Sequence, residues 1–256
     1  PQAAELLSSL GVNHQEQAAR SLQSLALHPS FPRGDNTFLG QFLESLGETF
    51  EPERAMANLE RILESRENPD ALLTALRRSS ERRSIVLTLA GGSQFLSDTI
   101  LRHPEYLDWL LKPMTLQKER TYEKMFLELW RWVRKAREYP DGPADALRRF
   151  RQREYLRIGI RDLLRMASME ETTLSLSNLA DATLEAALRI SRGELHAQYG
   201  KPRWRTPNGR WSPCDFAIIG MGKLGGRELN FSSDIDLIFV YSSDEGKTQG
   251  VPDSYT

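Results

Sequence analysis

The chain contains a single cysteine, Cys214, among its 256 residues, which excludes an internal disulfide framework and a cysteine-based zinc cluster. We therefore expect a protein of the reducing cytoplasm. No apolar run approaches the ~18 residues of a membrane-spanning helix, and no signal peptide opens the sequence. Neither sign of charge dominates, with 34 Lys and Arg against 35 Asp and Glu. Because a nucleic-acid polymerase is expected to carry a broad basic surface, this composition indicates neither a nucleic-acid nor a membrane partner.

Helical patterns, separated by Gly and Pro, fill most of the first 200 positions. The shorter predicted helices lie at 3–10, 14–27, 37–47, 52–65, 69–78, 81–90, 93–102 and 104–111. The longer ones lie at 116–136, 145–167 and about 172–198. The Pro- and Gly-containing stretch 200–213 breaks this pattern and predicts a loop or hairpin. The length allows one large or two ordinary domains, and we place a helical region at 1–200 and a second region at 201–256.

The most informative stretch lies between residues 216 and 241. Phe216–Ile219 is a short apolar run typical of a buried strand. A turn follows that contains four glycines, which bend sharply and approach ligands closely because they lack Cβ: Gly220, Gly222, Gly225 and Gly226. Asp234 and Asp236 then open a second apolar strand, where alternation places both on one face. Two such carboxylates repel each other unless a cation joins them, and Mg²⁺ suits one or two carboxylates together with substrate phosphates.

Residues 220–239 resemble the signature of glutamine synthetase adenylyltransferases, which belong to the polymerase-β-like nucleotidyltransferases. The resemblance implies a mainly α-helical amino-terminal region followed by the start of an α+β polymerase-β-like nucleotidyltransferase domain. That domain is truncated at Thr256, since the fold continues and takes a third carboxylate from a later strand. The resemblance also implies that Asp234 and Asp236 are the catalytic residues and hold Mg²⁺, with Gly225 and Gly226 at the nucleotide phosphates.

The candidate nucleotide- and phosphate-binding residues are Gly222, Lys223, Gly225, Gly226, Ser232 and Ser233. Backbone N–H groups of the turn can hold phosphate oxygens, because consecutive amides form an anion-binding concavity. The Lys223 side chain fits a phosphate contact and a solvated turn equally well. For Ser232 and Ser233 we favour capping over phosphate binding.

The activity implied by the resemblance is AMP transfer on a tyrosine of glutamine synthetase. Three upstream segments, 95–98, 103–107 and 157–164, look more like the amino-terminal half of this two-part enzyme, which removes AMP by phosphorolysis and yields ADP. Implied partners are glutamine synthetase, an adenine nucleotide, phosphate and the nitrogen-regulatory protein PII. The alternatives are the AMP-adding activity and a helical docking or regulatory module. We expect a chain ending at Thr256 to be weakly active or inactive by itself.

Two further patterns have competing interpretations. Gly220-x-Gly222-x-x-Gly225, with Asp244 or Glu245 downstream, satisfies a dinucleotide-binding fingerprint. The segment from 222 to 234 is too short for a crossover helix and its return loop, so we disfavour this interpretation.

The second pattern is a row of arginines that recurs every four residues: Arg149, Arg153, Arg157, Arg161 and Arg165. Such a row can meet phosphates or an acidic partner. We favour pairing within the helix, through Glu154 with Arg157 and Asp162 with Arg165.

Overall fold

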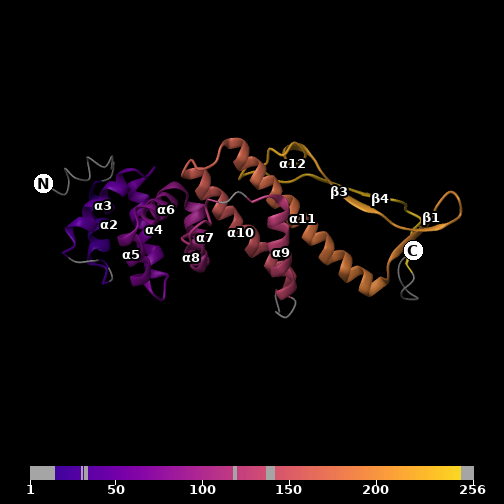
Figure 1. The fold of residues 1–256 in the computed structure, drawn as a ribbon, viewed down its shortest axis with the longest axis horizontal. Coiled ribbons are helices and arrows are strands. Elements are labelled where there is room, and N and C mark those ends of the chain that lie inside the picture. The colour runs from indigo at the N-terminus through magenta and orange to yellow at the C-terminus, as the bar shows by residue number, and fades with distance from the viewer. Residues whose placement is uncertain (1–14, 30, 32–33, 118–119, 137–141, 249–256) are drawn as a thin grey trace. The chain divides into compact units, whose positions relative to one another are not determined.

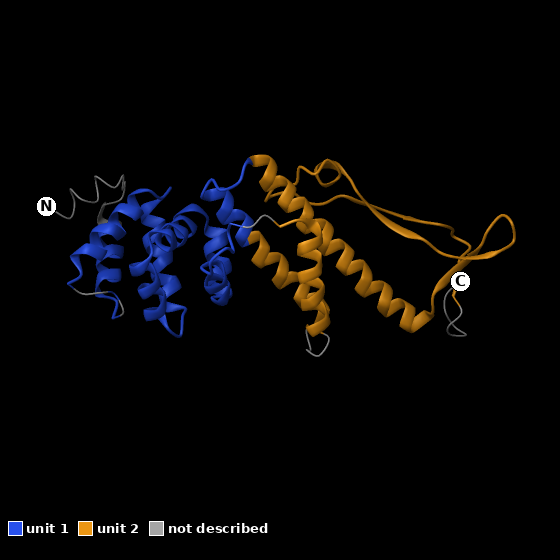
Figure 2. Cartoon of the chain, in the orientation of Figure 1, with its two compact units in different colours: residues 1–119, 156–168 blue, residues 120–155, 169–256 orange. Residues whose placement is uncertain are grey.

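The structure is a computed structural model, and it describes residues 15–29, 31, 34–117, 120–136 and 142–248. The chain divides into two compact units, one formed by residues 1–119 and 156–168 and the other by 120–155 and 169–256 (Figure 2). Secondary structure changes from helix to strand between residues 199 and 202. The two units therefore do not follow the predicted division into regions 1–200 and 201–256. That division stays a prediction.

The first unit is helical, and Figure 1 colours most of it from indigo to magenta. Its helices are α2 (Gln15–Leu27), α3 (Asn36–Gly47), α4 (Pro52–Glu64), α5 (Pro69–Arg78), α6 (Ser80–Gly92), α7 (Gln94–Arg102), α8 (Glu105–Leu110) and the last turns of α10 (Gly142–Leu163). Their apolar faces form one core that includes Phe31, Phe38 and Phe42, whose ring centroids lie 5.5–6.0 Å apart. Burial of these faces supplies the main driving force for folding of the unit.

The sequence explains where several of these helices begin. Pro52 and Pro69 occupy first helical turns, where the missing N–H is harmless. The Asn68 side chain accepts a hydrogen bond from the Ala71 N–H at 3.1 Å and thereby caps α5. For α6 the cap is Ser79, whose Oγ accepts from the Arg82 N–H at 3.2 Å.

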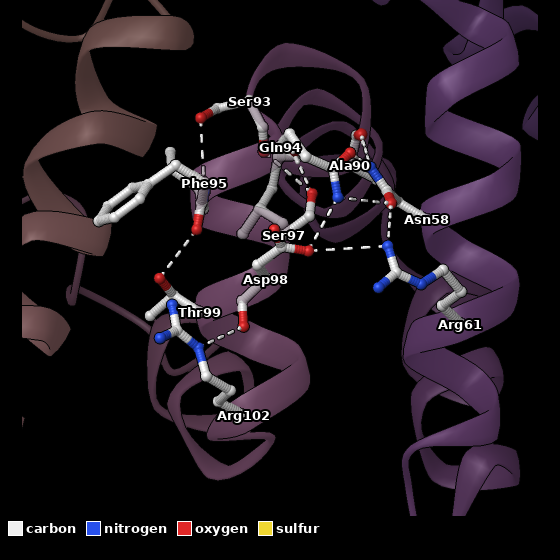
Figure 3. A network of polar contacts seen from close by, with 12 residues as sticks. Asn58, Arg61, Ala90, Ser93, Gln94, Phe95, Ser97, Asp98, Thr99 and Arg102 are labelled. Carbon is white, nitrogen blue, oxygen red and sulfur yellow. Dashed lines mark hydrogen bonds and ion pairs between the residues drawn. The ribbon is translucent and has the colours of Figure 1, made fainter.

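A polar network that starts at the buried Asn58 side chain joins α4 to α6 and α7 (Figure 3). Asn58, only 2% exposed, donates through Nδ2 to the Ala90 carbonyl at 2.9 Å and to Gln94 Oε1 at 3.1 Å. Gln94 donates in turn to Asp98 at 2.8 Å, and Asp98 pairs with Arg61 at 3.6 Å. A buried amide without such partners would be costly, so the network fixes how these three helices pack.

The second unit combines helices with two small antiparallel sheets (Figure 1). Its elements are α9 (Tyr122–Ala136), the first part of α10, α11 (Met169–Tyr199), β1 (Pro202–Arg205), β2 (Trp211–Pro213), β3 (Phe216–Gly220), α12 (Gly222–Gly225), β4 (Leu237–Tyr241) and β5 (Lys247–Thr248). One sheet has the order β2-β1-β5 and the other pairs β3 with β4, with Ile218 opposite Phe239. The glycine turn and the two carboxylates both lie on the connection from β3 to β4.

The predicted succession of helices followed by strands is confirmed, with differences at the ends of elements. The hairpin expected within 200–213 is formed by β1 and β2. The helix predicted at 3–10 lies outside the described residues, and the polymerase-β-like fold stays a prediction. Within the described ranges, no helix combines the length and the apolar character needed to cross a membrane.

Candidate functional site

The glycine turn connects the end of β3 to a single helical turn, α12. Gly222 has φ +53°, a left-handed conformation that glycine adopts without strain. The N–H groups of Gly225 and Gly226 donate to Met221 O at 3.1 Å and to Gly222 O at 2.9 Å. Those of Gly222 and Lys223 have no acceptor in the part of the chain that the structure describes. The donors left for a phosphate are therefore at the start of the turn.

The carboxylates of Asp234 and Asp236 are exposed and lie just before β4, which begins at Leu237. The expectation that both residues belong to the strand was wrong, because the strand begins one residue after Asp236. The segment is still linked to the glycine turn, since the Met221 N–H donates to Asp236 O at 2.9 Å. Asp236 Oδ2 lies only 3.7 Å from the place that a Cβ on Gly222 would take. The structure thus brings the Asp236 carboxylate to the glycine turn.

Neither Asp234 nor Asp236 forms a side-chain hydrogen bond or ion pair within the described ranges, so both carboxylates are available to a ligand. These ranges also contain no cluster of three or more metal-binding side chains. Two free carboxylates fit Mg²⁺, which keeps several waters and completes its shell with substrate phosphates, better than a metal that needs a full protein cage. This set of donors suits the predicted Mg²⁺ site, which stays a prediction.

The two serines that were predicted as candidate phosphate-binding residues, Ser232 and Ser233, take part in a local turn. Asn230 Oδ1 accepts from the Ser233 hydroxyl at 2.5 Å, and from the Ser232 hydroxyl and the Ser232 N–H, both at 3.2 Å. Asn side chains often shape turns in this way. Both hydroxyls are therefore engaged within the turn that precedes Asp234, and the choice between capping and phosphate binding stays a prediction. The Lys223 side chain is exposed beside the glycine turn.

The part of the chain that contains these residues matches a known protein family. The sequence model of the family described as glutamate-ammonia ligase adenylyltransferase matches residues 84–255, a range that includes the glycine turn and both carboxylates. The chain belongs to this family. The resemblance drawn from residues 220–239 is thereby confirmed.

Curated relatives carry the name bifunctional glutamine synthetase adenylyltransferase/adenylyl-removing enzyme. The one from Shewanella oneidensis is 40% identical over 163 residues, which is 64% of this chain and 16% of the relative. The one from Thioalkalivibrio sulfidiphilus is 32% identical over 195 residues, 69% of this chain and 20% of the relative. The one from Burkholderia mallei is 46% identical over 110 residues, 43% and 11% respectively. The chain thus matches about a fifth or less of the length of these relatives.

The strand pairing removes the dinucleotide-binding alternative for this family member. β3 and β4 are antiparallel, with Gly220 opposite Leu237, and α12 contains four residues. A dinucleotide-binding βαβ unit needs parallel strands and a full crossover helix. Gly220, Gly222 and Gly225 therefore serve a tight turn between antiparallel strands, as the length argument indicated.

Sequence reasoning missed the contacts that hold the loop between the glycine turn and the carboxylates. Arg227 Nη1 lies 3.3 Å from Asp181 Oδ2, and Nη2 donates to Asn178 Oδ1. The Leu229 N–H donates to the Ser177 hydroxyl at 3.3 Å. These partners come from α11, about 50 residues earlier in the chain, so no local sequence signal could have indicated them.

Arg227 is also one of the few non-glycine residues with positive φ, at +60°. Arg227 is the left-handed residue of the motif that ends the helical turn α12. In this motif the Glu228 N–H donates to Lys223 O at 2.7 Å and the Arg227 N–H donates to Leu224 O at 3.0 Å. Glycine is the usual residue at this position of such a motif, and the left-handed conformation costs other residues about 1–2 kcal/mol. An arginine is retained here despite that cost.

Burial raises the pKa of the Asp181 carboxyl, and the nearby Arg227 guanidinium, which acts in the opposite direction, does not fully offset it. The charged carboxylate therefore contributes a cost to folding at neutral pH, which is relieved as the pH falls through its raised folded-state pKa. Asp181 and Arg227 are thus held together at a cost in both backbone conformation and desolvation.

The arginine row is largely structural, with one pair inside α10 and other partners outside it. The predicted pairing of Glu154 with Arg157 stays a prediction. Arg149 pairs with Asp145 at 2.8 Å, Arg153 with Glu128 at 2.5 Å, and Arg161 donates to the Leu116 carbonyl. Arg157 is 1% exposed. Three of these side chains thus contact protein groups and a fourth is buried, so the row does not present a continuous surface to phosphates.

One prediction concerns the tightest part of the turn. A Cβ on Gly225 would lie 2.6 Å from the Gly220 carbonyl oxygen, which is backbone and cannot move cheaply. On Gly226, with φ −77°, its closest contact would be an ordinary 3.6 Å. We expect Gly225→Ala to lower the free energy of unfolding by about 1–3 kcal/mol and Gly226→Ala to be neutral. Urea unfolding of both variants is the measurement, and equal effects would contradict the turn geometry.

Proposed function

We propose that this chain supplies the metal- and phosphate-binding part of a site that removes AMP from an adenylylated tyrosine of glutamine synthetase. The observation that carries the proposal is the meeting of the glycine turn with two unpaired carboxylates, Asp234 and Asp236. The names of the relatives indicate the substrate, since each includes glutamine synthetase and an adenylyl-removing activity. The chain would act within a longer polypeptide, because it matches about a fifth or less of these relatives.

The reaction is a displacement at phosphorus. An oxygen of inorganic phosphate attacks the phosphorus of the tyrosyl-AMP ester, the bond from phosphorus to the tyrosine oxygen breaks, and the products are ADP and the tyrosine, whose oxygen takes up a proton. Mg²⁺ held by Asp234 and Asp236 would supply neutralisation of the charge on the phosphoryl oxygens.

The chain's own residues position the substrate. The free N–H groups of Gly222 and Lys223 are oriented by the turn and can hold a phosphate oxygen through backbone donors, without a side chain that must be ordered first. Because Asp236 lies close to Gly222, its carboxylate would be near a phosphate oxygen held there. Catalysis of this kind depends on positioning and charge, so no nucleophilic side chain is required.

The direction of AMP transfer must be tested by experiment, because the relatives' name includes both the addition and the removal of AMP. The complete enzyme would be incubated with glutamine synthetase carrying labelled AMP, with and without phosphate. We expect phosphate-dependent release of label as ADP, and its loss when Asp234 and Asp236 are both changed to Asn. If that double variant retained AMP removal and lost only ATP-dependent AMP addition, this site would be the adenylylating one. Binding of PII stays a separate prediction.

A further inference from the structure

The segment from Arg227 to Ser233, here called the anchored loop, connects the glycine turn to Asp234 and Asp236. Three kinds of contact hold it to helices of the same unit. The guanidinium of Arg227 meets Asn178 and Asp181, which lie three residues apart on one face of α11. Within the described ranges, this is the one contact of the loop that is both charge-assisted and double.

The remaining contacts are weaker but continue along the loop. The Leu229 N–H donates to Ser177 Oγ at 3.3 Å, and Leu229 is 4% exposed. The Phe231 ring packs edge-on against Tyr155 with centroids 5.5 Å apart, and the Tyr155 hydroxyl donates to Phe231 O at 3.4 Å. The loop is thus attached at every second residue up to Phe231, three residues before Asp234.

The carboxylates themselves have no such support. Asp234 and Asp236 are exposed and make no side-chain hydrogen bond or ion pair within the described ranges, so their positions depend on the backbone on either side. On one side this is β4, and on the other it is the anchored loop. A shift of the loop would therefore move Asp234 relative to the donors of Gly222 and Lys223.

We propose that Arg227 is a positioning residue: by binding Asn178 and Asp181, it fixes the path of the anchored loop and thereby the place of the two carboxylates beside the glycine turn. An arginine at this left-handed position is explained by that task, because glycine would relieve the backbone but could not reach α11. The catalytic consequence rests on the proposed function, whereas the ordering of the loop does not.

The chain offers a matched control for the substitution. Arg165 has φ +54° and follows α10 in the same hydrogen-bonded motif, with the Met166 N–H donating to Arg161 O at 2.8 Å and the Arg165 N–H to Asp162 O at 2.9 Å. Its side chain is exposed. Arg227→Gly and Arg165→Gly therefore make the same chemical change at the same backbone conformation, and only the first removes the contact with α11. Both variants should fold, because glycine suits this conformation.

Two measurements on the complete enzyme test the inference. Hydrogen exchange of residues 229–236 should become about 10-fold faster in Arg227→Gly and stay unchanged in Arg165→Gly. Binding of Mn²⁺ in the presence of ADP, followed by electron paramagnetic resonance, should weaken about 10-fold in Arg227→Gly, the usual effect of losing a residue that orients metal ligands.

A third variant distinguishes positioning from direct contact with substrate. Asn178→Ala should reproduce the effects of Arg227→Gly, and the double variant should add little, because both act through one contact. Unchanged loop exchange in Arg227→Gly, or effects of the two variants that add fully, would overturn the inference. If the unaltered enzyme bound no Mn²⁺ with ADP while Arg227→Gly still freed the loop, the proposed function would fail and the positioning role would stand.

Discussion

Replacing Asp236 by Asn in the complete enzyme should reduce phosphate-dependent release of AMP from glutamine synthetase by more than about 100-fold, with Asp234→Asn close behind. The reason is the loss of a charged oxygen ligand. Residues that only orient a metal ligand already change affinity or activity 10–100-fold, and loss of the ligand itself should exceed that. Asp236 is expected to be the more sensitive position, because its Oδ2 lies beside Gly222.

The same substitutions should leave folding intact. Both carboxylates are exposed and unpaired within the described ranges, so each Asn variant should unfold within about 0.5 kcal/mol of the unaltered protein. Activity and stability should therefore separate, as they do for functional residues and do not for residues of the core.

A carboxylate beyond the other end of β4 provides the control. Asp244 follows β4 and accepts a hydrogen bond from the Tyr241 hydroxyl at 2.5 Å, away from the glycine turn. Asp244→Asn should retain full AMP removal. The two measurements are the rate of ADP formation at saturating Mg²⁺ and the urea midpoint of each variant. Near-normal activity of Asp236→Asn, within 10-fold, would be incompatible with a metal ligand at this position.

The elements that the sequence predicted well are those with local signals. α4 and α5 begin with Pro in the first turn, and their apolar periodicity matches the buried faces. The glycine turn and the strand that follows it were likewise indicated by residues within a span of about 25 positions. In each case the information lies within a few residues of the structure that it determines.

The ends of elements were predicted less well where the usual residue is missing. The helix expected to reach residue 167 ends at Leu163, and Arg165 takes the left-handed position that glycine normally fills. The sequence therefore contains no stop signal there. Arg227 poses the same difficulty: Gly226 is the natural candidate for positive φ, yet it has φ −77°.

Partners distant in sequence could not be predicted at all. Arg227 meets α11 nearly 50 residues upstream, and Arg153 meets Glu128 of α9, 25 residues upstream. The helical spacing of the arginine row predicted pairing within one helix, because i,i+3 and i,i+4 neighbours are the pairs that a sequence displays. Arg149 has such a neighbour, Asp145, whereas tertiary packing gives Arg153 a partner on α9.

Replacing Glu154 by Ala should lower the free energy of unfolding by about 3–5 kcal/mol, the typical effect of breaking a buried ion pair from one side. Glu154 is fully buried and accepts from Arg120 at 2.8 Å and from Arg153 at 3.4 Å. Glu128 bridges the same two arginines, at 2.6 Å and 2.5 Å. Removing Glu154 would thus take one carboxylate from a cluster in which Arg120 and Arg153 both contact Glu128 and Glu154.

Acid should weaken the same network. Burial alone would raise the pKa of Glu128, but its hydrogen bond with Arg153 and the charges of Arg153 and Arg120 outweigh burial and lower it. A carboxyl with a lowered folded-state pKa contributes stability above its unfolded pKa, and this contribution is lost as the pH falls through the folded value. Glu128→Gln should therefore flatten the decline of stability in acid.

An exposed pair tests whether burial is the cause. Glu185 pairs with Arg189 at 2.6 Å on the surface of α11, and Glu185→Ala should cost about 0.5 kcal/mol or less. Urea unfolding, followed by Trp fluorescence, measures all three variants, since Trp132 stacks on the Arg153 guanidinium at 4.3 Å. A loss below 1 kcal/mol for Glu154→Ala would mean that water or rearranged side chains compensate the two arginines. Because α9 and α10 are held through this cluster, a large loss would show that the packing of the second unit depends on charge pairing as well as on apolar burial.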